Sequence, residues 1–302
     1  MTAARAPVAV DRRALARALT RAARASVDDT LRGAEAPTAT APRIGVTGAP
    51  GVGKSSLVAR LARHRVERTA PLAVIAIDPS SPHTCGSLLG DRIRMDSAAD
   101  DPRIYIRSLA SGQAQDGLSD NLPEVLAAVD AFGFAEVILE TVGVGQSEYG
   151  VRELVDVELL VLMPGSGDTV QAMKAGILET ADIVVVNKAD LPGAQRMALD
   201  LRSVFGSRRS AVPPPVVLVR HDDDADSHQL SGRIDEALAR CMRPAAGDER
   251  RRRFNRYRVQ RLAARRLSEA IALLPASRFD ERPVDVYRDL LARLAEQARS
   301  PG

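Results

Sequence analysis

Short apolar runs recur along the middle of the chain, and each is followed by a segment long enough to form a helix. The runs are rich in Val, Ile and Leu, and they lie at residues 44–47, 72–77, 104–106, 137–139, 157–162, 183–186 and 216–219. Strand-like runs that alternate with helix-length segments are typical of a parallel sheet covered by helices on both faces. The pattern predicts an α/β fold with a mostly parallel, doubly wound sheet.

The two ends of the chain follow a helical pattern instead. Residues 9–33 carry Ala, Leu and Arg at helical spacing, and after about Met242 no strand-like run remains. Residues 247–273 and 283–298 predict two arginine-rich helices, separated near Pro275. We therefore expect an N-terminal helical segment at 1–40, a sheet domain at 41–242 and a C-terminal helical arm at 243–302.

Composition excludes several classes of protein. No apolar run reaches the roughly 20 residues that a membrane span needs, and two cysteines among 302 residues cannot build a disulfide framework. The arginine- and alanine-rich start could suggest a mitochondrial presequence, but Asp11, Asp28 and Asp29 favour an ordinary amphipathic helix. We expect a cytoplasmic protein that does not act at a membrane.

The number and type of the basic residues are also informative about function. The net charge is only +3 and the charges are spread along the chain, which argues against a dedicated nucleic-acid binder. Only three of the 42 basic residues are lysines, namely Lys54, Lys174 and Lys188. In a chain so rich in arginine, a retained lysine suggests a place where the planar guanidinium does not fit.

A glycine-rich segment joins the predicted strand at 44–47 to a helical run at 56–64. Such glycines let backbone N–H groups turn toward the β- and γ-phosphates of a nucleotide, and the helix N-terminus favours the same negative charge. We expect Lys54 to reach the phosphate oxygens and Ser55 to offer its hydroxyl to Mg²⁺. The predicted phosphate-binding residues are Gly48, Pro50, Gly51, Val52, Gly53, Lys54, Ser55 and Ser56.

The sequence Asn-Lys-Ala-Asp at residues 187–190 directly follows another predicted strand. The Asp190 carboxylate could accept hydrogen bonds from N1–H and the 2-amino group of guanine, whereas adenine offers neither in that arrangement. Lys188 would lay its stem along the base, and Asn187 would hold the loop. Because an unpaired buried polar group costs about 1–3 kcal/mol, these residues predict a preference for GTP over ATP.

Carboxylates follow two further predicted strands. Glu140 opens a Glu-Thr-Val-Gly segment, which is similar to the Asp-x-x-Gly of many GTPases, and Asp78 follows the run at 72–77. Asp91 lies at the start of a polar helix, where it could instead be a helix cap. Strand ends meet at one edge of a parallel sheet, and carboxylate oxygens suit Mg²⁺. The predicted metal-binding residues are Ser55, Asp78, Asp91 and Glu140.

The loop after Glu140 could act as a nucleotide-dependent switch. Gly143 could donate its N–H to the γ-phosphate, which would give the loop two states. Gln146 could position the attacking water, although a structural role within the loop is an equally good explanation.

Three segments together resemble the methylmalonyl-CoA mutase-associated GTPases. They are Asp-Pro-Ser-Ser-Pro at 78–82, Leu-Gly-Asp-Arg-Ile-Arg-Met at 89–95 and Glu-Thr-Val-Gly-Val-Gly-Gln-Ser-Glu at 140–148. The resemblance implies a homodimeric P-loop GTPase that binds GTP or GDP with Mg²⁺ and serves adenosylcobalamin-dependent acyl-CoA mutases. Such proteins are chaperones that gate loading of the cobalamin cofactor and protect the mutase.

The same resemblance assigns roles by matched position. It implies that Lys54 and Ser55 hold phosphate and Mg²⁺, and that Glu140 belongs to the catalytic metal and switch region. Residues 165–174 resemble a further segment of the family that rearranges toward the nucleotide. We therefore expect Lys174 to supply positive charge to the hydrolytic transition state, with a surface lysine as the alternative.

The chain departs from the family pattern at several positions. Thr169 stands where an acidic residue is usual. At residues 219–221 the sequence is Val-Arg-His, where a Ser-Ala loop that contacts guanine is expected. The far wall of the base site is therefore unusual.

Two other functions compete with a mutase-associated GTPase. His83 and Cys85 could suggest a GTPase that delivers a metal ion during metalloenzyme maturation. A small-molecule kinase on the same P-loop scaffold is the second alternative. The arginines at 250–261 could bind nucleic acid, but acidic neighbours such as Asp248 and Glu249 favour a solvated or dimer-facing helix.

Overall fold

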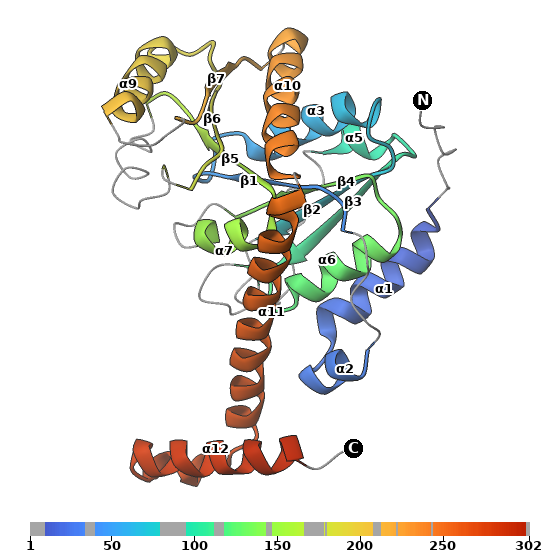
Figure 1. Cartoon of the computed structure of the whole chain (residues 1–302), viewed down its shortest axis with the longest axis vertical. Helices are drawn as coiled ribbons and strands as arrows, with labels where there is room; N and C mark the ends of the chain where they lie inside the picture. The colour runs from blue at the N-terminus through green and yellow to red at the C-terminus, as the bar shows by residue number, and fades with distance from the viewer. Residues whose placement is uncertain are drawn as a thin grey trace.

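A parallel sheet forms the centre of the molecule (Figure 1). This computed structural model describes residues 10–33, 40–78, 95–111, 118–142, 147–165, 178, 180–207, 213–221, 223–242 and 244–299. The strands are β1 (Arg43–Thr47), β2 (Leu72–Asp78), β3 (Ile104–Ala110), β4 (Glu136–Glu140), β5 (Val157–Leu162), β6 (Ile183–Asn187) and β7 (Val216–Val219). They are ordered β3-β2-β4-β1-β5-β6-β7, and every neighbouring pair is parallel. The predicted doubly wound α/β fold is confirmed.

Helices cover both faces of this sheet. One face packs against α3 (Lys54–Val66), α5 (Asp96–Ala99) and α10 (Asp224–Cys241). The other face packs against α1 (Arg12–Arg24), α6 (Leu122–Ala131), α7 (Ser147–Leu154) and α9 (Ala194–Ser207). The central strands are fully buried along their length, as expected for a sheet that is covered on both sides.

The N-terminal helical segment differs from its prediction. Instead of one helix over residues 9–33, the chain forms α1 and then α2 (Val27–Arg32). Ser26 begins the second helix with a capping box, because its hydroxyl accepts from the Asp29 N–H while the Asp29 carboxylate accepts from the Ser26 N–H. The apolar spacing continues through this break, so periodicity alone did not reveal it.

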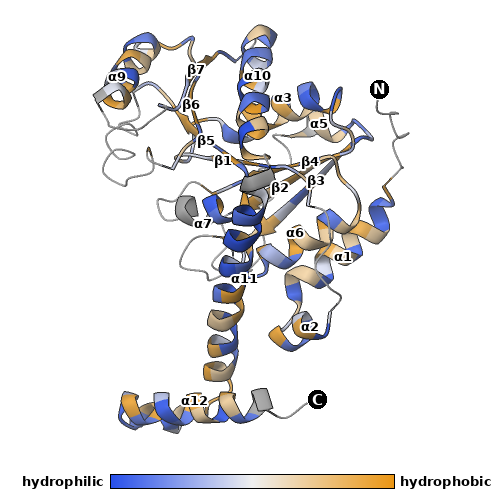
Figure 2. Ribbon diagram, viewed as in Figure 1, coloured by the Kyte–Doolittle hydropathy of each residue, from blue (hydrophilic) through white to orange (hydrophobic). Residues whose placement is uncertain are grey.

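The C-terminal arm extends away from the sheet (Figure 1). Helix α11 (Pro244–Ala272) runs past α7 and α2, a short 3-10 helix η2 (Ala276–Asp280) follows, and α12 (Pro283–Arg299) crosses the far end. The part of α11 beside the sheet domain is strongly hydrophilic, as Figure 2 shows. Among the described helices, none is long and apolar enough to cross a membrane.

Arginine side chains attach α11 to the body at several points along the helix. Arg250 pairs with Asp156 at 2.9 Å, and Arg258 pairs with Glu124 at 3.2 Å. Arg261 continues the series with Asp120 at 2.6 Å, and Arg266 pairs with Asp28 of α2. The basic residues that could suggest nucleic-acid binding are therefore largely engaged with acidic partners of the same chain.

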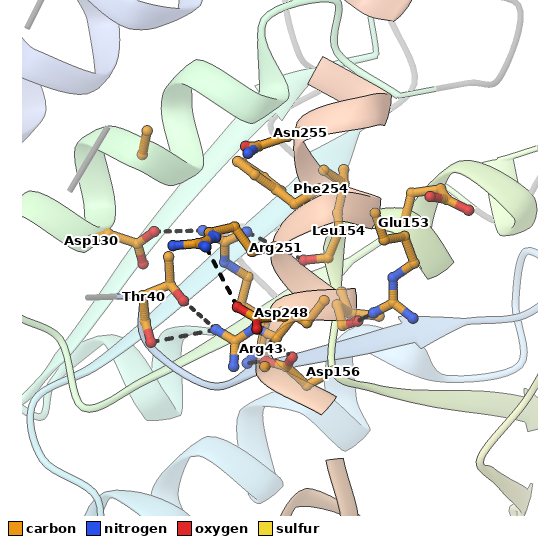
Figure 3. A pocket seen from close by; sticks show the side chains of 15 residues that line it. Thr40, Arg43, Asp130, Glu153, Leu154, Asp156, Asp248, Arg251, Phe254 and Asn255 are labelled. Carbon is orange, nitrogen blue, oxygen red and sulfur yellow. Dashed lines mark hydrogen bonds and ion pairs between the residues drawn. The ribbon is translucent and has the colours of Figure 1, made fainter. Parts of the chain in front are cut away.

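The start of α11 closes a pocket at the amino-terminal edge of the sheet, seen close by in Figure 3. Its volume is about 460 Å³. Arg43 lies in its wall, paired with Asp130, and its guanidinium lies 4.8 Å from the centre of the Phe254 ring of α11. Burial raises the pKa of Asp130 and of Asp156 above the usual carboxyl value. This cluster lies at the opposite edge of the sheet from the predicted nucleotide site.

Candidate functional site

The loop between β1 and α3 has a backbone shape that requires glycine at two places. Gly48 has a φ of +140°, and a Cβ atom there would lie 2.2 Å from the carbonyl oxygen of Val161. Gly53 has a φ of +92°, and its Cβ would lie 2.6 Å from the Asn187 amide nitrogen. Both positions exclude side chains because of backbone conformation and close approach. The loop therefore has the strand-loop-helix setting expected of a phosphate-binding loop.

Lys54 folds back over this loop. Its side chain is buried, and Nζ donates hydrogen bonds to the carbonyl oxygens of Gly48 at 2.8 Å and Ala49 at 3.0 Å. A lysine ammonium is a compact charge with three donors, so it can serve a narrow loop of this kind. The ammonium lies within the loop that a bound phosphate would occupy.

Ser55 and Glu140 come together across 85 positions of the chain. The Ser55 hydroxyl donates to Glu140 Oε1 at 2.7 Å, and both side chains are buried. Asp78 is also buried, at the end of the neighbouring strand β2, where Ala76 is in register with Glu140. A hydroxyl with two nearby carboxylates is an all-oxygen set that suits Mg²⁺. These residues fit the predicted metal role.

Residues 187–190 are joined directly to the phosphate loop. Asn187 Nδ2 donates to the Val52 carbonyl at 2.8 Å, and Lys188 Nζ donates to the Gly51 carbonyl at 3.0 Å. Lys188 has a φ of +52°, an uncommon value for a residue other than glycine. Asp190 follows two residues later and is exposed. The predicted base-binding and phosphate-binding residues thus form one continuous surface.

The segment after β7 forms the adjoining wall. Ala189 N–H donates to the Val219 carbonyl at 3.0 Å, so Arg220 and His221 follow directly beside residues 187–190. Arg60 of α3 donates to both the Arg220 and His221 carbonyls. Sequence reasoning noted that residues 219–221 are unusual but did not identify Arg60 as their partner.

Several predicted residues lie outside the described part of the chain. They are Asp91, Gly143, Gln146 and Lys174, together with His83, Cys85 and Thr169. Within the described residues, no group of three or more His, Cys, Asp and Glu side chains has an arrangement that could hold a metal ion. The metal set described above includes only two carboxylates and relies on the Ser55 hydroxyl.

Comparison with known proteins gives one family. The model of the family described as methylmalonyl-CoA mutase-associated GTPase MeaB matches residues 13–274. A putative GTPase of Caulobacter vibrioides is 43% identical over 221 residues, which cover 70% of this chain and 68% of the relative. A putative GTPase of Pyrococcus abyssi is 44% identical over 180 residues, which cover 58% and 55%. The chain thus matches between about half and two thirds of the length of these relatives.

Two further similarities are to a fused mutase and to a solved structure. The fused isobutyryl-CoA mutase of Cupriavidus metallidurans is 44% identical over 194 residues, which cover 62% of this chain but only 18% of that protein. The solved structure of a LAO/AO transport system kinase covers 95% of this chain and 99% of its own, with a TM-score of 0.55 and 21% identity. This second likeness supports the fold.

Proposed function

Because this chain belongs to the family of methylmalonyl-CoA mutase-associated GTPases, we propose that its hydrolysis of GTP is coupled to an adenosylcobalamin-dependent acyl-CoA mutase. In this role the chain gates loading of the cobalamin cofactor and protects the mutase. The observation that carries the proposal is the fused isobutyryl-CoA mutase, in which a region similar to this chain forms 18% of a protein named as a mutase. In the fused protein the two regions are joined covalently, and we propose that this chain binds its mutase as a separate protein.

We propose a separate role in GTP hydrolysis for each residue of the site. Ser55, Asp78 and Glu140 would hold Mg²⁺, which supplies positive charge to the β- and γ-phosphates when it is bound. Lys54 binds the phosphate oxygens from inside the loop, where its ammonium lies 2.8 Å from the Gly48 carbonyl. We assign Asp91 to the same metal shell, and Gly143 to a backbone contact with the γ-phosphate.

Water attack on the γ-phosphorus yields GDP and inorganic phosphate. Gln146 is proposed to orient the attacking water, and Lys174 to add positive charge to the transition state. At the base, Asp190 accepts hydrogen bonds from guanine, Lys188 lies along the ring, and Asn187 holds the loop through its bond to Val52.

Addition of a purified cobalamin-dependent isobutyryl-CoA mutase is expected to raise GTP turnover by about tenfold or more. The stabilisation of transition-state charge by one positioned cation is of this order or larger. Phosphate release measured with and without the mutase checks this result, and Lys174→Ala should remove most of the increase in turnover. Equal turnover with and without the mutase would contradict the partnership, whereas stimulation that survives Lys174→Ala would contradict only the role of Lys174.

The exposed apolar residues of the arm support a homodimer. Leu273 is 86% exposed, Phe279 60% and Tyr287 57%, although large apolar side chains are usually covered. We propose that this surface pairs with a second copy of the chain. Phe279→Asp should then shift the mass measured by light scattering toward that of a monomer, whereas Leu199→Asp, at an exposed position of α9, should not. A monomeric mass for the unmodified chain would refute the pairing.

A further inference from the structure

The short segment Arg220–His221 follows β7 and lies between residues 187–190, helix α3 and helix α10. Val219 is in register with Asn187, and its carbonyl accepts from the Ala189 N–H at 3.0 Å. The two residues that follow therefore emerge from the sheet beside residues 187–190. Their position makes them a wall of the base site proposed above.

Arg60 fastens this wall to the phosphate-binding helix. It lies on α3, six residues after Lys54, and its Nη1 donates to the Arg220 carbonyl at 2.7 Å and also to the His221 carbonyl. One nitrogen thus holds two successive carbonyls of a segment that lies about 160 positions away in the chain. A rise of about 1.5 Å per residue puts Arg60 about 9 Å along the helix axis from Lys54.

Asp226 of α10 holds the same segment from another direction. Its Oδ2 accepts from the Arg220 N–H at 2.9 Å and from Arg220 Nε at 2.9 Å, while Oδ1 accepts from Nη2 at 3.1 Å. The hydrogen bond from the Arg220 side chain lowers the pKa of the Asp226 carboxyl below its usual value. Asp223 adds a second carboxylate 2.6 Å from Arg220 Nη2.

These contacts occupy the polar backbone groups of Arg220. Its N–H faces Asp226 and its carbonyl faces Arg60, so neither group points freely toward a base. Arg220 would therefore shape the base site by its position and not by a backbone hydrogen bond to the base. A wall of this kind can still sharpen selectivity, because a site held in its binding shape loses less entropy when the ligand enters.

We propose that Arg60 is a positioning residue for the guanine base. By holding Arg220–His221 against α3, it fixes the shape of the base site beside Asp190 and links that shape to the helix that begins at Lys54. The inference rests on the base site proposed above, and it is independent of the mutase partnership.

Arg60→Ala is expected to weaken GDP binding about tenfold while ADP binding, which depends on the phosphates, changes less than twofold. Displacement of a fluorescent GDP analogue by GDP and by millimolar ADP, with Mg²⁺ present, measures both affinities. For GTP hydrolysis the KM should rise and kcat should stay within about twofold. Arg60→Lys should retain most of the selectivity, since a single ammonium can replace the single Nη1 that bonds both carbonyls.

Arg63→Ala is the matched control, because Arg63 lies on the same helix and is exposed. It should leave the ratio of GDP to ADP affinity unchanged. The inference is wrong if Arg60→Ala keeps that ratio within twofold in a folded protein, or if Arg60→Ala and Arg63→Ala lower it equally. If Arg60 had a purely structural role, Arg60→Ala would instead lower the unfolding temperature and weaken the binding of GDP and ADP equally.

A separate variant distinguishes failure of the base site from failure of this inference. Asp190→Asn should lose the preference for GDP and gain affinity for xanthosine diphosphate, because the Asn amide can donate to the 2-carbonyl of xanthine. If Asp190→Asn leaves GDP binding intact, the base site itself is misplaced. If it behaves as expected and Arg60→Ala has no effect on selectivity, only the role of Arg60 is refuted.

Discussion

Replacing Lys54 by alanine is expected to weaken the binding of GTP and GDP by about a hundredfold or more. The substitution removes a buried ammonium from inside the phosphate loop, where hydrogen bonds to charged groups are among the strongest in proteins. A hundredfold loss corresponds to about 2.7 kcal/mol. Titration calorimetry with Mg²⁺ and each nucleotide measures the affinity directly.

Lys54→Arg is a sharper form of the same experiment. Nζ lies 2.8 and 3.0 Å from the carbonyls of Gly48 and Ala49, so the loop closes around a single nitrogen and leaves little room for a wider guanidinium. We expect this variant to bind nucleotide nearly as poorly as the alanine variant, although its charge is kept. Affinity within threefold of the unmodified protein in Lys54→Ala would show that phosphate binds elsewhere.

Replacing Arg65 by alanine is expected to lower the free energy of unfolding by about 3–5 kcal/mol. Arg65 is 1% exposed, and its Nε donates to Glu136 Oε1 at 2.6 Å in a two-armed ion pair. Glu136 is also 1% exposed, so the substitution leaves a buried carboxylate without its partner. Urea denaturation, followed by circular dichroism without nucleotide, measures the loss.

Arg68 supplies a matched control for this stability effect. Like Arg65, it donates to the Ser231 hydroxyl and pairs with Asp235, each at 2.9 Å. Its side chain is 54% exposed, so Arg68→Ala should cost no more than about 1 kcal/mol. Equal losses in Arg65→Ala and Arg68→Ala would mean that the bond to Glu136 does not carry the effect.

Much of the fold was predictable because the strands are buried on both faces. Runs such as Val157–Leu162 and Ile183–Asn187 are almost wholly apolar and are bounded by polar segments, so each stands out without knowledge of its neighbours. The same strands explain why the site could be anticipated. Glu140 and Asn187 end their strands, and a parallel sheet brings such ends to one edge.

The parts that escaped prediction depend on contacts between distant segments. Arg60 and Arg65 lie on a helix whose sequence suggests solvent-facing arginines, yet Arg65 is buried against β4 and Arg60 reaches the segment after β7. Helical spacing does place Arg65 on the buried face, since it lies three and four residues after buried Ala62 and Leu61, whereas Arg63 is exposed. What the spacing does not reveal is the partner of each arginine, because Glu136 of β4 and the Arg220 carbonyl come from distant parts of the chain.

The arginine contacts of α11 also fix the position of the helix along its own axis. Pairs with Asp156, Glu124 and Asp120 follow one another along the helix, so a shift of one turn would break them together. The 29 residues of α11 form a rod about 43 Å long at 1.5 Å per residue. Because the Arg266–Asp28 pair is, among these arginine contacts, the nearest to α12 along the helix, a force applied at α12 would reach α2 before it reached Asp156 and the sheet.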